Sequence, residues 1–552
     1  MEGKGLKKRI PIGVDDFKEI RDEGYYFVDK SELISDILSE RNKVYLFTRP
    51  RRFGKSLNLS MLDAFFNLKY PKDNKWFDGL KVSDCKECQE HKNAYPVIHL
   101  KMKDISVRNL DDFINDIKSL MSSTYDGFDY LIDDDRIRGS LRRDYLDTYV
   151  SDFSNTSLKM SLSRLCEMLH IYHGVKPIVL IDEYDNIINQ AFNRSIYADV
   201  IDFIRSFLSS ALKSNEHLEF AVITGVMQIA KESIFSGLNN ITVNNIFSKK
   251  FDERYGFTED EVKTLCKEYD HPEKFEEAKE WYDGYRFGDA EIYNPWSVLR
   301  YISENFIPAT YWSGTSGNDI INTLLDSADD DVYSELHRLG NGESIISSLN
   351  STVIMNDIGV DGTAIYSIMA VSGYLNAVPD DSDAFLLSIP NKEMYKVFAE
   401  MMTKHINDSA SVAFAYLFDG MEDMNIDKMQ KALDMIFNKN IPFILLSKEK
   451  DYQLILGAAA MSRLGRYTVS LEEESGNGRA DIIMRPNRSG LPNIILEMKR
   501  SDSIGDLESD SSKAISQIEE KGYFRNMKGR ILLYGISFNG KSSRTSMKEM
   551  TG

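Results

Sequence analysis

A short run near the N-terminus carries groups that bind phosphate. Residues 48–57 read Thr-Arg-Pro-Arg-Arg-Phe-Gly-Lys-Ser-Leu, and the Gly54-Lys55-Ser56 core matches the end of a phosphate-binding loop. In such a loop, backbone N–H groups and the start of the next helix hold phosphate oxygens, the lysine neutralises phosphates, and the serine hydroxyl ligates Mg²⁺. Arg49 stands where the usual pattern has glycine, so an ordinary strand–turn–helix is the alternative interpretation.

A pair of acidic residues follows an apolar run further along. Residues 177–185 read Pro-Ile-Val-Leu-Ile-Asp-Glu-Tyr-Asp. Asp182 would bind Mg²⁺, directly or through water, and Glu183 is placed to polarise the attacking water. A helix N-cap explains an isolated acidic strand end, but both motifs in this order predict ATP binding through Walker A and Walker B elements.

Thr224 ends another apolar run and is a candidate sensor of the γ-phosphate, although a hydroxyl that only ends a strand explains it equally well. Glu183 is the expected catalytic residue, and Ser56 and Asp182 are the expected Mg²⁺ ligands. The expected nucleotide contacts are Arg52, Gly54, Lys55, Ser56, Leu57, Asp182 and Thr224.

A carboxylate–lysine pattern lies near the C-terminus. Asp481 opens an apolar run, and after a turn residues 493–499 read Asn-Ile-Ile-Leu-Glu-Met-Lys. Glu497 and Lys499 are two apart on a strand, so their side chains share one face. Two carboxylates beside a lysine can hold one or two Mg²⁺ ions that activate water for attack on a phosphodiester. A hairpin with an edge-strand salt-bridge ladder is the alternative.

The elements that must position these residues divide the chain into three parts. Apolar runs at 44–48, 97–100, 178–181 and 220–224 alternate with helical segments, which predicts an α/β fold with a parallel sheet covered on both faces. Ligands bind such sheets at the carboxyl ends of the strands. A mostly helical region follows, opened by a capping box at Thr258 and Glu261, and then a small α+β pattern. The expected domains are 1–250, 251–440 and 441–552.

The composition limits the partners. The chain has 552 residues, a net charge of −19 and 42% hydrophobic residues, which excludes a wholly disordered chain and a uniform basic coat. From Arg479 to Gly552 there are 13 basic and 9 acidic residues, a local net charge of +4, so this end permits a nucleic-acid contact. No run of about 18 apolar residues and no secretory h-region is present, so we expect a cytoplasmic protein with no membrane contact. Cys85 and Cys88 lack a second pair and are interpreted as a surface turn rather than a zinc site.

The motif set resembles the bacterial AAA-ATPase-like family. The segments that carry the resemblance are Pro11–Ile20, Tyr26–Lys30, Arg49–Ser56, Phe235–Asn240, Tyr255–Thr258, Trp281–Gly288, Tyr293–Ser297 and Ser316–Asp319. In that family Arg-Pro-Arg-Arg is the usual form of the loop, so Arg49 is a family variant. The resemblance implies a P-loop NTPase sheet with additional helical lids.

The stretch from Pro442 to Tyr534 resembles the PD-(D/E)XK nuclease-like domain that commonly follows this ATPase, a restriction-endonuclease-like α+β fold. The resemblance implies catalytic roles for Asp481, Glu497, Lys499 and Gln517 and metal ligation by Glu449, Asp481 and Glu497. Ala480 stands where the superfamily name places proline. A setting in genome defence or mobile-element biology is implied by analogy alone.

Three functions remain open. The first is an ATP-controlled, Mg²⁺-dependent nuclease that acts on DNA or RNA through its C-terminal domain. The second is a regulatory NTPase switch whose C-terminal domain binds nucleic acid or a partner without catalysis. The third is an ATP binder without turnover. The sequence also leaves a homo-oligomer open.

Overall fold

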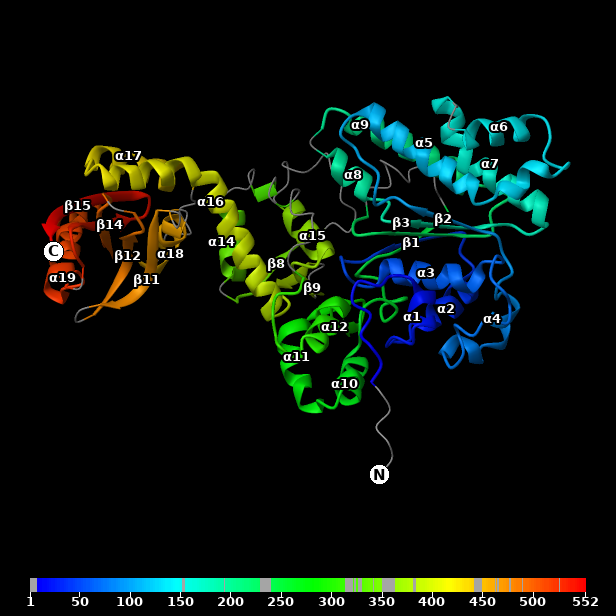
Figure 1. Ribbon diagram of the computed structural model, residues 1–552, viewed down its shortest axis with the longest axis horizontal. Coiled ribbons are helices and arrows are strands. Elements are labelled where there is room, and N and C mark those ends of the chain that lie inside the picture. Colours follow the sequence, from blue (N-terminus) through cyan, green and yellow to red (C-terminus); the bar gives the residue numbers. More distant parts are fainter. Residues whose placement is uncertain are drawn as a thin grey trace. The chain divides into compact units, whose positions relative to one another are not determined.

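The computed structural model separates into two compact units, one formed by Met1–Asp326 with Ser344–Lys396 and the other by Ser327–Glu343 with Val397–Gly552 (Figure 1). No helix in the described part of the chain is both long and apolar enough to cross a membrane. The structure describes residues 7–150, 154–192, 194–228, 240–312, 321, 324–325, 330–340, 342–349, 363–380, 384–440, 449–461, 463, 466–475, 478–488, 490–525 and 527–552.

The first unit is built on a five-stranded parallel sheet in the order β2-β3-β4-β1-β5. Its strands are β1 (Val44–Thr48), β2 (Val97–Lys101), β3 (Ile178–Asp182), β4 (Ala221–Gly225) and β5 (Ile241–Asn244). Every residue of β1, β3 and β4 is buried, as expected when helices cover both faces. The predicted α/β fold class is therefore confirmed, and four of these strands were predicted while β5 was not.

Helices cover both faces of this sheet. Helix α3 (Lys55–Phe66) lies on one face, and α5 (Leu110–Asp126), α7 (Asn155–His173) and α9 (Tyr197–Leu212) lie on the other (Figure 1). Shorter helices surround them: α1 (Phe17–Asp22), α2 (Glu32–Glu40), α4 (Lys86–Glu90), α6 (Ser140–Tyr149) and α8 (Asn186–Ala191). Cys85 caps the N-terminus of α4 and Cys88 lies within this helix, so the segment is not a simple turn, and the structure joins the two cysteines in a disulfide.

The remainder of the first unit is mostly helical. The predicted capping box is confirmed at Thr258 and Glu261, where α10 begins. The other elements of this part are α10 (Glu259–Glu268), α11 (Phe275–Tyr282), β6 (Tyr285–Phe287), β7 (Ala290–Ile292), α12 (Pro295–Ser303), β8 (Ile345–Ser347), α15 (Thr363–Ser372), β9 (Asn376–Pro379) and β10 (Phe385–Ser388). Its core is rich in tyrosine and phenylalanine, which agrees with the aromatic segments of the sequence.

The second unit contains a mixed five-stranded sheet in the order β11-β12-β13-β14-β15. Only β13 and β14 are parallel, and α19 connects them. Gly535 of β14 lets α19 pack closely, because a Cβ there would lie 2.1 Å from the Ser511 carbonyl oxygen. The elements are α14 (Asp330–Gly340), most of α16 (Lys392–Glu422), which begins in the first unit, α17 (Ile426–Asp434), α18 (Glu449–Met461), β11 (Tyr467–Ser475), β12 (Gly478–Pro486), β13 (Asn493–Arg500), α19 (Leu507–Lys521), β14 (Arg530–Asn539) and β15 (Ser542–Thr551). This arrangement confirms the predicted C-terminal α+β fold.

Candidate functional site

The loop between β1 and α3 is closed around the Lys55 ammonium group. Lys55 is buried, and its Nζ donates to the carbonyl oxygens of Arg49 at 2.9 Å and Pro50 at 2.8 Å. Burial lowers the pKa of Lys55 to about 8, against the opposing effect of nearby carboxylates. Gly54, at φ +80°, adopts a left-handed backbone that favours glycine. The loop therefore holds a buried cation whose hydrogen bonds go to neutral carbonyls, which a phosphate could replace.

Arg49, in the position of the missing glycine, links this loop to a distant part of the same unit. Its guanidinium group is fully buried and donates to the carbonyl oxygens of Asn244 at 2.7 Å and Phe251 at 3.3 Å. It also lies 5.2 Å from the ring centre of Tyr255 and 5.1 Å from that of Phe287, within cation–π range. Burial lowers the pKa of Arg49 to about 10, so it stays charged at neutral pH. The departure from the usual pattern thus has a structural role.

Arg52 and Phe53 are also held by aromatic residues. The Arg52 guanidinium lies 4.2 Å from the ring centre of Trp296, and the Arg52 backbone is left-handed at φ 70°. The buried Phe53 ring packs against Tyr285 and Phe287 at centroid distances of 5.1 Å. Reasoning from the sequence did not assign Trp296 a part in the loop, although the aromatic-rich segments around it were the available signal.

The acidic end of β3 lies beside Thr224 at the end of β4. The Thr224 hydroxyl donates to Asp182 Oδ1 at 2.5 Å, and the Glu183 N–H donates to Thr224 Oγ1 at 3.4 Å. Burial raises the pKa of Glu183, and Lys55 opposes that shift. Glu183 has a left-handed backbone at φ 53°, a conformation that costs a non-glycine residue about 1–3 kcal/mol and occurs often at functional sites. The structure therefore brings Lys55, Asp182, Glu183 and Thr224 together.

Asp185 is a further member of this site that the sequence reasoning missed. It is buried, and its Oδ2 accepts hydrogen bonds from the N–H groups of Val226 and Met227, each at 2.9 Å. Burial raises its pKa. These bonds fix the segment after β4 against the end of β3. Ser56 and Leu57, expected to contact nucleotide, occupy the first turn of α3 directly after Lys55.

A second constellation lies in the second unit, on β12, β13 and α19. Asp481 Oδ2 accepts from the Met498 N–H at 2.7 Å, which places this carboxylate beside the segment that carries Glu497 and Lys499. Lys499 Nζ lies 3.3 Å from Glu497 Oε1, and Gln517 Nε2 donates to the same oxygen. The four residues expected to be catalytic in this domain are thus adjacent.

Glu497 is poised to receive a cation. It is 2% exposed, and burial together with the Asp481 charge raises its pKa to about 7, while Lys499 opposes the shift. Its Oε2 is buried and forms no hydrogen bond with any described residue. An unsatisfied carboxylate oxygen beside a second carboxylate fits a hard divalent cation such as Mg²⁺.

The ligand set is incomplete within the described residues, which contain no group of three or more His, Cys, Asp or Glu arranged around a metal position. Glu449, expected as a third ligand, begins α18, but its side chain lies outside the described residues. Gln453, on the first turns of the same helix, donates to Asp481 Oδ1 at 2.9 Å. The sequence reasoning did not give Gln453 a role.

Comparisons with known proteins match the two regions of the chain that carry these residues. Residues 11–235 match a family model described as Predicted AAA-ATPase, and residues 447–548 match that of the PD-(D/E)XK nuclease superfamily. An uncharacterized protein from the vnfD 5′ region of Azotobacter chroococcum mcd 1 is 24% identical over 556 residues, covering 97% of both chains. The solved structure of the ORC2 protein of Aeropyrum pernix, in ADPNP–ADP complexes, is 11% identical with a TM-score of 0.23, covering 68% of this chain and 92% of its own.

Proposed function

We propose that this chain, which combines an AAA-ATPase-like region with a PD-(D/E)XK nuclease-like region as its motifs predicted, hydrolyses ATP and cleaves nucleic acid at a Mg²⁺-dependent C-terminal site. The observation that carries the proposal is the pair Asp481 and Glu497, in which one buried carboxylate oxygen has no partner among the described residues. Burying such a group without a ligand is unfavourable. The site is therefore suited to bind a cation in its working state.

At the C-terminal site, Asp481 and Glu497 would hold Mg²⁺, with Glu449 as a further ligand. The bound ion would activate water and neutralise charge on the phosphodiester. Lys499, now 3.3 Å from Glu497, would release that carboxylate and orient the attacking water. Gln517 would keep the Glu497 carboxyl group in position through its hydrogen bond.

At the N-terminal site, Lys55 would exchange the loop carbonyls for phosphate oxygens of ATP. Ser56 and Asp182 would ligate Mg²⁺, and Glu183 would polarise the attacking water. Thr224 would hold the Asp182 carboxylate through the hydrogen bond that they already share. Arg52, Gly54 and Leu57 would complete the contacts with the nucleotide.

The division of labour that we propose follows three parts: residues 1–250 bind nucleotide, residues 251–440 transmit its state, and residues 441–552 act on DNA or RNA. Arg49 of the first part supports the link to the second, because its guanidinium group bonds to the Phe251 carbonyl and lies against the Phe287 ring. A cytoplasmic setting and a role in genome defence or mobile-element biology belong to this proposal and rest on the resemblance alone.

The test is cleavage of DNA and RNA by the full-length protein with Mg²⁺ and ATP, compared with the same mixture in EDTA. We expect Lys499→Ala to reduce cleavage by about 100-fold or more, as for the loss of a group that acts in the transition state. Arg500→Ala, at the exposed neighbouring position, is the matched control and should retain cleavage. Equal cleavage by the wild type and the Lys499→Ala variant would overturn the assignment.

A regulatory NTPase switch is the second candidate function. It is favoured by Asp481, whose two carboxylate oxygens already accept hydrogen bonds from Gln453 and from the Met498 N–H. In this case the C-terminal domain would bind nucleic acid or a partner without cutting. Calorimetric titration with Mg²⁺ and Mn²⁺ distinguishes the two functions. A nuclease predicts metal binding that the Asp481→Asn variant loses, whereas a switch predicts either no metal binding at this site or the same binding in the wild type and the variant.

A further inference from the structure

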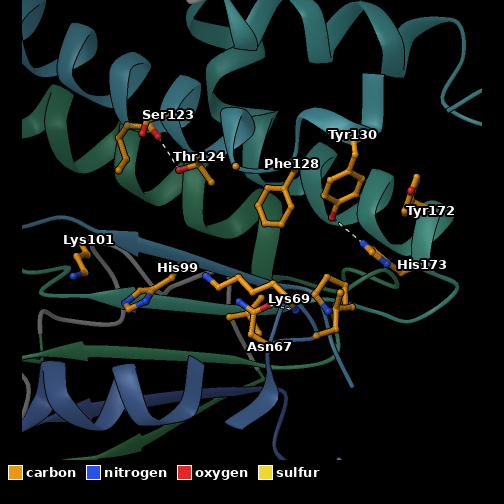
Figure 2. Close-up of a pocket in the computed structure, with 15 residues that line it drawn as sticks. Asn67, Lys69, His99, Lys101, Ser123, Thr124, Phe128, Tyr130, Tyr172 and His173 are labelled. Carbon is orange, nitrogen blue, oxygen red and sulfur yellow. Dashed lines mark hydrogen bonds between the residues drawn. The ribbon is translucent and has the colours of Figure 1, made fainter. Parts of the chain in front are cut away.

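A cavity of about 590 Å³ lies along the open edge of the parallel sheet in the first unit (Figure 2). One wall is β2, the end strand in the sheet order. The other walls are residues 67–69 after α3, residues 120–130 at the end of α5 and beyond, and residues 172–173 at the end of α7. The volume is typical of a small-molecule site, and none of the site residues described above lines it.

The charged side chains of this cavity are cationic. Its lining contains Lys69 and Lys101 but no aspartate or glutamate, and Figure 2 shows the two lysines on either side of His99. Lys69 Nζ forms an ion pair with Asp63 Oδ2 at 3.8 Å, whereas Lys101 is exposed and forms no ion pair with a described residue. The local potential therefore favours an anion.

The wall opposite the strand is aromatic. Phe128, Tyr130 and Tyr172 line it, with centroid distances of 6.2 Å between the first two rings and 4.8 Å between the last two. The Tyr130 hydroxyl is hydrogen-bonded to His173 Nε2 at 2.8 Å, which fixes both rings. Planar ligands gain from stacking against such rings.

His99 lies on the edge strand β2 and lines the cavity. Its Nε2 is buried and has no hydrogen bond with a described residue, and burial lowers the pKa of the ring, so the imidazole is neutral. The bonds from Ile178 N–H to the Pro96 carbonyl and from Met102 N–H to the Asp182 carbonyl show that the even-numbered residues of β2 face β3. The backbone N–H and C=O of His99 therefore face the open edge, where they offer a donor and an acceptor side by side.

We propose that this cavity binds a nucleotide at a site separate from the Lys55 loop. The base would stack on Phe128 and form hydrogen bonds with the backbone edge at His99, and the phosphate would lie near Lys101. A nucleotide has the three properties that complement the lining of this cavity: a planar ring, paired donors and acceptors, and negative charge. The size of the cavity favours this ligand over a long peptide added to the strand edge.

The probe is AMP, which lacks the β- and γ-phosphates that Lys55 would neutralise, and the measurement is calorimetry on the full-length protein. We expect the Lys55→Ala variant to bind one AMP per chain. Lys101→Glu and Phe128→Ala should each weaken this binding by about tenfold or more. Lys72→Glu, a charge reversal at an exposed lysine outside the lining, is the matched control and should leave AMP affinity unchanged.

Several results would overturn the proposal. These are no AMP binding by the Lys55→Ala variant, unchanged affinity in Lys101→Glu, inorganic phosphate binding as tightly as AMP, and binding of an extended acidic peptide in place of AMP. Absence of ATP hydrolysis by the wild type would contradict the proposed ATPase function, but it would not affect the measurement of AMP binding. The two proposals can therefore fail independently.

Discussion

The two candidate sites bury charges of opposite sign. In the first unit the buried group is the Lys55 ammonium, whose pKa burial lowers to about 8. In the second unit it is the Glu497 carboxyl group, whose pKa is raised to about 7 by burial and by Asp481. Each group has partners in its own site. Lys55 donates to loop carbonyls, and Glu497 accepts from Lys499 and from Gln517.

The difference shows which ligand each site lacks. Burial disfavours the charged form of a group, and a ligand of opposite charge recovers that free energy. The first site is therefore prepared for an anion such as a phosphate, and the second for a cation such as Mg²⁺. The same physical device supports both halves of the proposed function.

The largest expected effect concerns the first site. Glu183→Gln should lower ATP hydrolysis by about 1,000-fold, since the amide cannot accept the proton of the attacking water, while nucleotide affinity stays close to that of the wild type. Phosphate release measures the change, and Glu216→Gln, at a side chain that is 87% exposed, is the control. Equal release from wild type and Glu183→Gln would favour an ATP binder without turnover.

The next largest effect tests whether the buried guanidinium group of Arg49 stabilises the fold of the first unit. Arg49→Gly restores the usual loop glycine but leaves the Asn244 and Phe251 carbonyls without their donor and opens a gap between two aromatic rings. We expect a loss of about 3 kcal/mol in the free energy of unfolding, measured by urea denaturation. A loss below about 1 kcal/mol would mean that the guanidinium is not structural. Arg51→Gly, at a less buried position of the same loop, controls for backbone flexibility.

At the second site, removing the buried charge is expected to raise the free energy of unfolding rather than lower it. Glu497 keeps a proton in the folded state that it loses in the unfolded state, so the free energy of unfolding falls as pH rises from about 4.5 to about 7. Glu497→Gln removes this penalty and should stabilise the metal-free protein by about 1–2 kcal/mol at pH 8. Glu520→Gln, an exposed change on α19, should have no such effect. A destabilised Glu497→Gln variant would show that the carboxylate is fully compensated.

The smallest effect is a pair of proton counts. At pH 8, ADP should cause uptake of about half a proton, because a phosphate favours the charged form of Lys55. At pH 7, Mg²⁺ should cause release of about half a proton from Glu497. Calorimetry in buffers of different ionisation enthalpy measures both. Proton changes of the same sign would contradict the comparison between the sites.

Much of this arrangement was predictable from local sequence. Strands β1 to β4 were predicted because buried parallel strands are continuous apolar runs, and Asp182 ends one of them. The ExK spacing put Glu497 and Lys499 on one face of β13, and the structure agrees. Strand β11 was not predicted, since its Glu472-Glu473-Glu474 run is polar and pairing with β12 compensates for weak strand propensity.

The partners of buried polar groups were beyond local reasoning. Arg49 bonds to carbonyls that are 195 and 202 residues away in the chain, and no pattern near residue 49 indicates them. Gln453 and Asp185 were missed for the same reason, because their roles depend on strands that reach them only after folding. Tertiary contacts decide these positions, not spacing.

The burial of Arg49 also bears on how such proteins can change over evolutionary time. Its guanidinium is enclosed by Tyr255 and Phe287 and bonded to Asn244 and Phe251, so losing either aromatic ring would leave a buried charge poorly compensated. A loop with glycine in place of Arg49 would in turn leave these rings around an empty space. The loop and the aromatic segment should therefore be inherited as one piece, with substitutions in one accompanied by substitutions in the other.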